Sequence, residues 1–232
     1  MSTTERRTFL QRLAAGTLAL SVAPSFSRAS APTSPTSPLA PATTATGPGS
    51  LGAWDEKWMD VLTGRYKQFF DAEEVRDATV FGVVRNLLNG YRDAYGTKDT
   101  EVSAVVGLHG VAASLAFKDS AWAKFRLGQQ GSITDPATRM PALINIVVTA
   151  SPALSADASI PALQGRGVVV ALCNNSLNRI TRTLEAGGYG KAEAMRAELL
   201  GEHLLPGVVL VPAMVVASNR LQMRGFGYWK LG

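Results

Sequence analysis

Apolar positions recur along the chain from about residue 54 in two alternating patterns. Short continuous apolar runs, such as Val102–Leu108 and 168–172, are typical of strands buried on both faces. Between these runs, apolar residues return every three or four positions, as in amphipathic helices. The pattern predicts strands at 66–70, 102–108, 168–172, 208–211 and 226–231, and helices at 54–62, 78–95, 115–127, 159–164, 173–186, 191–203 and 214–223.

One long segment fits neither pattern. Residues 128–158 contain the β-branched run Ile144–Val148, which favours a strand, but Pro and Ser residues flank that run and favour a loop. The two alternatives stay open at this stage.

Apolar strands that alternate with helices predict a fold class. Parallel strands buried on both faces need helices on both sides of the sheet. Right-handed crossovers then give an α/β fold, a three-layer sandwich with a small, mostly parallel sheet and flavodoxin-like layering.

The N-terminal residues are patterned differently. Residues 1–31 contain a charged start with Arg6 and Arg7, an apolar run from Leu13 to Ala23, and small residues at 29–31, which is the pattern of a signal peptide. The apolar run is about half of the roughly 20 residues that a membrane-crossing helix needs. Arg6-Arg7 followed by Thr-Phe-Leu resembles the twin-arginine export motif. We therefore expect contact with the twin-arginine translocon and a periplasmic location.

The next segment is of low complexity. Residues 32–50 are almost entirely Pro, Thr, Ser, Ala and Gly, a composition that cannot bury enough apolar surface to fold. We expect residues 32–50 to be a disordered linker and residues 51–232 to form the folded domain.

Charge and cysteine content argue against a nucleic-acid partner and against an internal disulfide. The formal net charge of +5 falls to +2 without residues 1–31, which carry four arginines and one glutamate. A nucleic-acid-binding domain needs clustered basic residues, and no such cluster stands out, so we expect no nucleic-acid partner. The single cysteine, Cys173, excludes an internal disulfide.

Two residues lie where parallel sheets bind ligands, beyond the carboxyl ends of strands. His109 follows the strand 102–108, and Cys173 follows the strand 168–172 and precedes a helix. A helix N-terminus favours a thiolate, but unpaired cysteines are also often simply buried. His109 is consistent with a general acid or base, a metal or haem ligand, or a donor to an anion, and also with a ring that only satisfies a nearby backbone group. The sequence does not establish that the two strands are neighbours.

No motif in the sequence indicates metal binding, nucleotide binding or serine catalysis. Two histidines and one cysteine at wide spacing give no zinc pattern, so we expect no metal site. The sequence contains neither a dinucleotide-binding glycine motif nor a P-loop, and no cofactor is identified. Ser176 has no evident catalytic partners, and His203, near a helix C-terminus, reads as structural.

Several segments together resemble the DsrE/DsrF-like family. They are His109-Gly110, the run 167–177 around Cys173, the segment 206–213 and the closing segment 221–228. The resemblance spans roughly residues 64–232. It implies a small α/β sandwich that assembles as a homo-oligomer, a trimer or hexamer. It also implies that Cys173 occupies the position where some members carry sulfur as a persulfide.

Three hypotheses follow for the function. In the first, an exported protein binds or relays sulfane sulfur through a persulfide on Cys173, with a sulfur donor or acceptor protein as partner and with His109, Gly110, Asn174 and Asn175 as ligand contacts. In the second, the domain is a non-catalytic module that holds a small anion or metabolite, or haem, near His109. In the third, it is an oligomeric structural module of the periplasm. Whether the protein is an enzyme stays open, because the inference rests on one cysteine.

Overall fold

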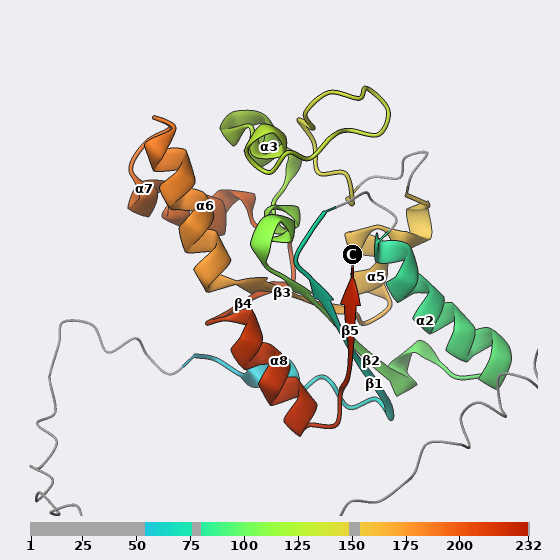
Figure 1. Ribbon diagram of the computed structural model, residues 1–232. Coiled ribbons are helices and arrows are strands. Elements are labelled where there is room, and N and C mark those ends of the chain that lie inside the picture. Colours follow the sequence, from blue (N-terminus) through green and yellow to red (C-terminus); the bar gives the residue numbers. More distant parts are fainter. Residues whose placement is uncertain (1–53, 76–79, 149–153, 232) are drawn as a thin grey trace, which may run out of the picture. The chain divides into compact units, whose positions relative to one another are not determined.

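The computed structural model describes residues 54–75, 80–148 and 154–231. The predicted signal peptide, with Arg6 and Arg7, and the predicted linker lie outside these residues. Five parallel strands form one sheet in the order β4-β3-β2-β1-β5 (Figure 1). The strands are β1 (Tyr66–Ala72), β2 (Val102–Leu108), β3 (Val169–Cys173), β4 (Val208–Val211) and β5 (Gly227–Leu231). The predicted α/β class and the five predicted strands are confirmed.

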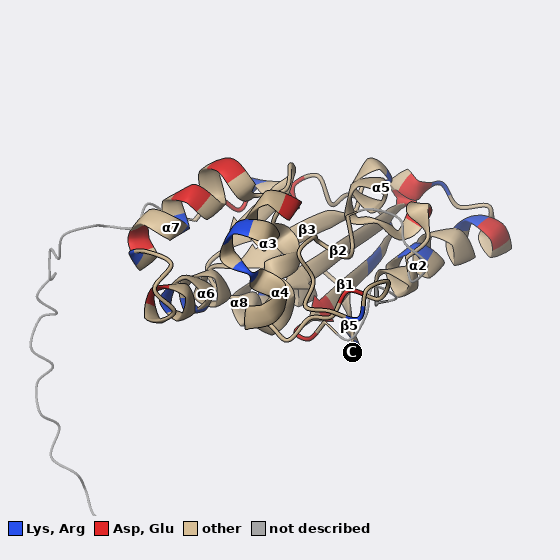
Figure 2. Ribbon diagram, turned by 90° about the horizontal axis from the view of Figure 1, so that it is seen from above, with Lys and Arg blue, Asp and Glu red and all other residues tan. Residues whose placement is uncertain are grey.

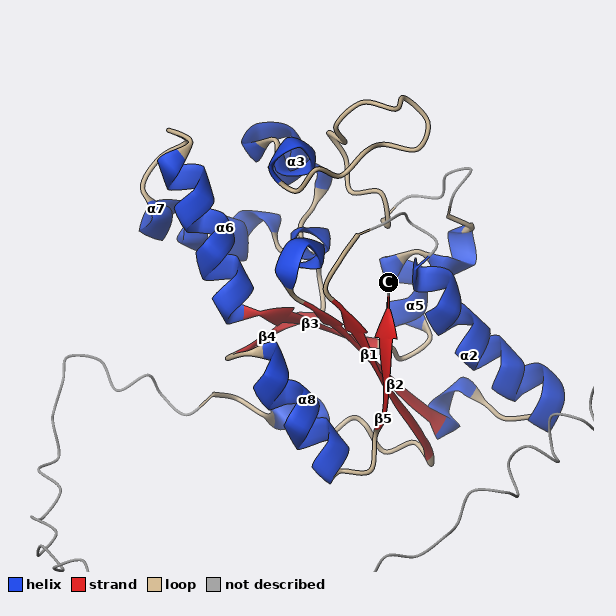
Figure 3. Ribbon diagram, in the orientation of Figure 1, coloured by secondary structure: helices blue, strands red, loops and turns tan. Residues whose placement is uncertain are grey.

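Helices separate the strands (Figure 3). The α-helices are α2 (Val80–Tyr95), α3 (Asp119–Phe125), α4 (Leu127–Gln130), α5 (Ile160–Gly165), α6 (Asn174–Ala186), α7 (Ala192–Glu198) and α8 (Met214–Met223). Shorter 3₁₀ turns are η1 (Lys57–Met59), η2 (Asp99–Glu101), η3 (Gly110–Ala116) and η4 (Ala156–Ala158), and η5 (Leu199–His203) is a π-turn. No helix among the described residues is long and apolar enough to cross a membrane.

The strand order explains the three layers. The chain steps from β1 through β2 and β3 to β4 in one direction, and then returns past β1 to add β5 at the opposite edge. Because parallel crossovers are right-handed, a reversal of direction places the connecting helix on the opposite face. Accordingly, α8 packs against β1, β2 and β5, on the side of the sheet away from α2 and α5 (Figure 1).

Two apolar clusters fill the two interfaces. Alternate strand residues such as Phe70 and Leu108 join a large cluster with α2, α5 and α6. The intervening residues, such as Phe69 and Val105, join a smaller cluster with α8, which also contains Cys173. The continuous apolar runs are thus buried on both faces, as the sequence predicts.

The predicted helix at 54–62 is wrong in length. Only the single turn η1 forms there, and it buries Met59, with Leu62 buried just beyond. Val61 is 71% exposed, so the apolar residues of this segment do not share one face. Without a common apolar stripe, a longer helix gains nothing from packing.

The predicted helix at 115–127 is also corrected. Residues 110–116 form the 3₁₀ turn η3, Phe117 is extended and bridges to Leu204, and α3 begins only at Asp119. The bridge links residues that are far apart in sequence, so helical periodicity could not reveal the break.

The ambiguous segment holds no strand at Ile144–Val148. A turn forms there instead around the buried Asn145. The Asn145 amide group donates to the carbonyl oxygens of Leu115 and Phe117 at 2.8 and 2.7 Å, and its backbone N–H donates to Asp119 at 2.8 Å. One polar side chain thereby satisfies the backbone of a buried loop.

In the part of the chain that the structure describes, basic residues do not gather on one element. In the view of Figure 2, Lys and Arg positions are spread over several helices together with Asp and Glu positions. Helix α2, for example, carries Arg85 and Arg92 beside Asp93, and Arg92 and Asp93 are paired at 2.8 Å.

Candidate ligand-binding site

The neighbouring strands β2, β1 and β5 bring three polar side chains together. Asp71 lies near the end of β1, His109 follows β2, and Tyr228 belongs to β5. The Tyr228 hydroxyl donates to Asp71 Oδ2 at 2.6 Å, and His109 Nε2 lies 2.7 Å from Asp71 Oδ1. We refer to Asp71, His109 and Tyr228 as the Asp71 cluster.

The His109–Asp71 contact is short but is not a well-aligned hydrogen bond. Both atoms are buried and have no aligned hydrogen-bond partner, although 2.7 Å separates them. Each atom is therefore the main polar neighbour of the other.

The Asp71 carboxylate is held in its charged form. Burial alone would raise its pKa, but the contacts with His109 and Tyr228 outweigh burial and lower the pKa below its ordinary value. The hydrogen bond from the Tyr228 hydroxyl to Asp71 favours the neutral form of the tyrosine. It raises the pKa of Tyr228 to about 12, with burial adding to the effect. Asp71 thus stays ionised and Tyr228 stays neutral at physiological pH.

The Asp71 cluster lines one wall of a cavity of about 330 Å³. Helix α8 forms the opposite wall. Its lining side chains recur every three or four residues and therefore lie on one face of the helix. This size is at the lower end of ligand pockets. The α8 residues that line the cavity are Met214, Val215, Ser218, Asn219 and Gln222.

Gly107 sets the distance between the sheet and α8. It pairs with Asp71 in the β1–β2 register, and a Cβ at this position would lie 2.7 Å from the Phe69 ring and against the Met214 sulfur. The missing side chain lets Met214 and Phe69 pack directly over β2, next to the cavity.

The predicted site residues are not all in this cavity. His109 lines it, and its strand is indeed the neighbour of the strand that ends at Cys173. Cys173 itself is only 4% exposed, inside the apolar cluster under α8. The accessible thiol that the sulfur hypothesis expects is therefore absent in this conformation.

The remaining predicted contacts have other positions. Gly110 has a φ of +56° and donates its N–H to Ser176 at 3.0 Å, so it closes the turn after β2. It lines a separate cavity of about 190 Å³ beside α6. Asn174 is partly buried with Oδ1 unpartnered, and Asn175 is exposed.

Sequence reasoning missed Asp71 and Tyr228. Asp71 directly follows the predicted strand 66–70, and a carboxylate at the end of a buried strand was a usable signal. Tyr228 gave no such signal, because its partner lies 157 residues away.

Comparisons with known proteins identify no family. No family model matches the chain, and no curated protein is significantly similar. Among solved structures, the chain is similar to a protein of unknown function, MTH1491 from Methanobacterium thermoautotrophicum. The two are 17% identical with a TM-score of 0.37, and the match covers 71% of this chain and 98% of that one. A likeness at this level assigns no activity.

Proposed function

We propose that the domain binds a small organic anion in the cavity between α8 and the Asp71 cluster. The observation that carries the proposal is that three strands deliver His109, Asp71 and Tyr228 to one wall of this cavity. Asp71 and His109 lie at the carboxyl edge of the parallel sheet, where ligands commonly bind, and the Tyr228 hydroxyl reaches Asp71 from near the start of β5.

The contacts within the Asp71 cluster indicate a different role for each of its residues. Asp71 already accepts from Tyr228 and pairs with His109, so its carboxylate positions these two side chains rather than the ligand. The second ring nitrogen of His109, Nδ1, is then the group that meets a ligand. With Nε2 facing Asp71, the imidazolium form of His109 donates a hydrogen bond from Nδ1 to an anion.

Helix α8 contributes the other recognition groups. Its first turn carries no acidic residue and belongs to the cavity wall through Met214 and Val215. The free N–H groups of a helix start favour negative charge. Ser218, Asn219 and Gln222 add hydrogen-bonding groups, whereas Met214 and Val215 provide apolar contact. A short carboxylate with a small apolar body fits this combination.

The test compares His109→Ala with the wild type. We expect short mono- and dicarboxylates to raise the melting temperature of the wild type, and expect affinity in His109→Ala to fall by about tenfold, the loss of one charge-assisted hydrogen bond. Isothermal titration calorimetry measures both affinities. A Lys191→Ala variant, far along the chain on an exposed loop, serves as the control. Equal affinities in wild type and His109→Ala would remove the site from this cavity.

A second function, sulfur transfer through Cys173, is favoured by a different observation. Cys173 ends β3 beside the end of β4, and the helices that follow these two strands lie on opposite faces of the sheet. In open α/β sheets, ligands bind where two adjacent strands are followed by helices on opposite faces. The unpartnered Asn174 Oδ1 lies next to it in sequence.

The persulfide hypothesis makes a direct prediction. With thiosulfate as donor, the Cys173 thiolate would take the outer sulfur atom and release sulfite. Intact mass spectrometry would then show gains of whole sulfur atoms that a reductant removes and that Cys173→Ser lacks. Because Cys173 is buried, we expect slow labelling of the native protein and fast labelling after unfolding. No mass gain after prolonged incubation would eliminate this function.

The setting of the site is also a proposal. We infer from the Arg6-Arg7 motif that the chain is exported by the twin-arginine route to the periplasm. Its sequence segments support membership of the DsrE/DsrF-like family and hence a homo-oligomer, either a trimer or a hexamer.

A further inference from the structure

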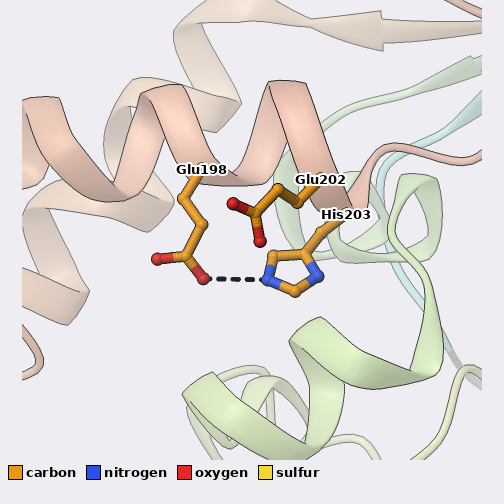
Figure 4. Close-up of side chains that lie close together, drawn as sticks. All are labelled: Glu198, Glu202 and His203. Atoms are coloured by element: carbon orange, nitrogen blue, oxygen red, sulfur yellow. Dashed lines mark hydrogen bonds and ion pairs between the residues drawn. The ribbon is translucent and has the colours of Figure 1, made fainter.

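A second group of potential ligating side chains lies apart from the Asp71 cluster. Glu198 at the end of α7 and Glu202 and His203 in η5 point toward one another (Figure 4). One ligand atom from each residue lies within 4.8 Å of the other two. None of the three lines the cavity under α8.

The π-turn η5 is what brings the three residues together. In an α-helix, residues four apart share a face, whereas a residue five apart is rotated away by about 140°. The wider i→i+5 turn of a π-helix returns the fifth residue to that face. Glu202 and His203, four and five residues after Glu198, therefore lie on the same side (Figure 4).

His203 is held as metal-binding histidines commonly are. The residue is 8% exposed, and its Nδ1 lies 2.8 Å from the Ser120 hydroxyl. Its Nε2 lies 2.8 Å from Glu198 Oε1. When Nδ1–H donates to Ser120, the Nε2 lone pair is directed at the carboxylates, and such an outer partner fixes the ring of a ligating histidine.

The carboxylates supply negative charge at an accessible position. The Lys124 ammonium lies 2.5 Å from Glu198 Oε1. The Lys124 side chain is 56% exposed, so a divalent cation can displace it into solvent. Glu202 is exposed and provides the entrance.

We propose that Glu198, Glu202 and His203 bind a divalent transition-metal ion of the Zn²⁺ class. One imidazole nitrogen and two carboxylate oxygens suit Zn²⁺, whereas Mg²⁺ prefers oxygen ligands alone. Three protein ligands leave one position for water. Tetrahedral ligands around Zn²⁺ lie about 3.4 Å apart, so a rotamer change of the exposed Glu202 closes the site.

The same residues also form an ion-pair network that ties α7 and η5 to α3. Lys124 and Ser120 of α3 contact Glu198 and His203, respectively. A purely structural network predicts no metal affinity. It also predicts no role for Glu202, whose carboxylate is not part of that chain of contacts.

The experiment titrates the full chain with ZnCl₂ and separately with MgCl₂ by isothermal titration calorimetry. We expect one Zn²⁺ per chain at this site, and at least about tenfold weaker binding in Glu202→Gln. Glu193→Gln removes an exposed glutamate from the same helix and should bind as the wild type does. Absent Zn²⁺ binding, or equal binding in wild type and Glu202→Gln, would overturn the proposal.

Cobalt spectroscopy locates the ion independently. Co²⁺ should give visible absorption of a low-coordinate nitrogen–oxygen site that persists in Cys173→Ser and His109→Ala and disappears in His203→Gln. Absorption that instead requires Cys173 or His109 would place the metal elsewhere and contradict the assignment. Retention of the helical circular dichroism in His203→Gln controls for folding.

Discussion

Gly128→Ala is expected to destabilise the protein by about 3 kcal/mol, the upper range for overpacking a buried site. Gly128 is buried in α4, and a Cβ there would lie 2.6 Å from the backbone nitrogen of Ala142 and closer still to its carbonyl oxygen. Backbone atoms cannot move aside as a flexible side chain can. The hydrogen bonds from Ile133 N to Gly128 O and from Ala142 N to Ile133 O hold the two segments together.

The matched control, Gly90→Ala, is expected to stabilise the protein slightly. Gly90→Ala places a methyl group on an exposed turn of α2, where nothing lies within 4 Å of it. Alanine in a helix interior is more favourable than glycine by up to about 1 kcal/mol. Urea denaturation should therefore show a lower midpoint for Gly128→Ala and a slightly higher one for Gly90→Ala. A Gly128→Ala midpoint equal to the wild type would contradict the close approach of α4 to residues 133–142.

Asp71→Asn is expected to cost about 2 kcal/mol at neutral pH, the usual range for hydrogen bonds to a charged group. The substitution keeps the shape of the side chain but removes the charge that His109 and Tyr228 contact. It should also weaken carboxylate binding, since the imidazole loses the group that positions it.

The pH dependence of the unfolding free energy tests whether the Asp71 charge causes this loss of stability. The folded-state pKa of Asp71 is lowered, so its contribution is present above the unfolded value of about 3.9 and is lost as pH falls through the lower, folded value. The difference in unfolding free energy between wild type and Asp71→Asn should thus be constant near neutral pH and shrink below about pH 4. Asp93→Asn, at an exposed ion pair, should change stability little. A difference that is unchanged at acidic pH would mean that the Asp71 charge is not what stabilises the fold.

The sheet could be predicted because its signal is local. Each buried strand is a short apolar run, and the runs at 102–108 and 208–211 match β2 and β4 to the residue. The strand before Cys173 is displaced by one residue, since Val168 precedes β3 and Cys173 closes it. Helix α2 likewise follows from its apolar stripe.

The loops and the site could not be predicted in the same way. The conformation of residues 110–148 depends on Asn145 reaching the carbonyls of Leu115 and Phe117, and on Phe117 reaching Leu204. The Asp71 cluster depends on the strand order, which puts β5 beside β1 instead of β4. Such contacts leave no periodic trace in the sequence.

The late position of β5 in the chain affects how the site is made. Tyr228 belongs to the last strand of the sheet, yet it bonds to Asp71, which lies 157 residues earlier in the sequence. Pairings over such separations are slow to form. Strands β1 to β4 can assemble first, and the cavity exists only after α8 and β5 have docked. A chain in which β5 has not docked would therefore lack the proposed ligand site, so occupancy by the proposed ligand would report that β5 has joined the sheet.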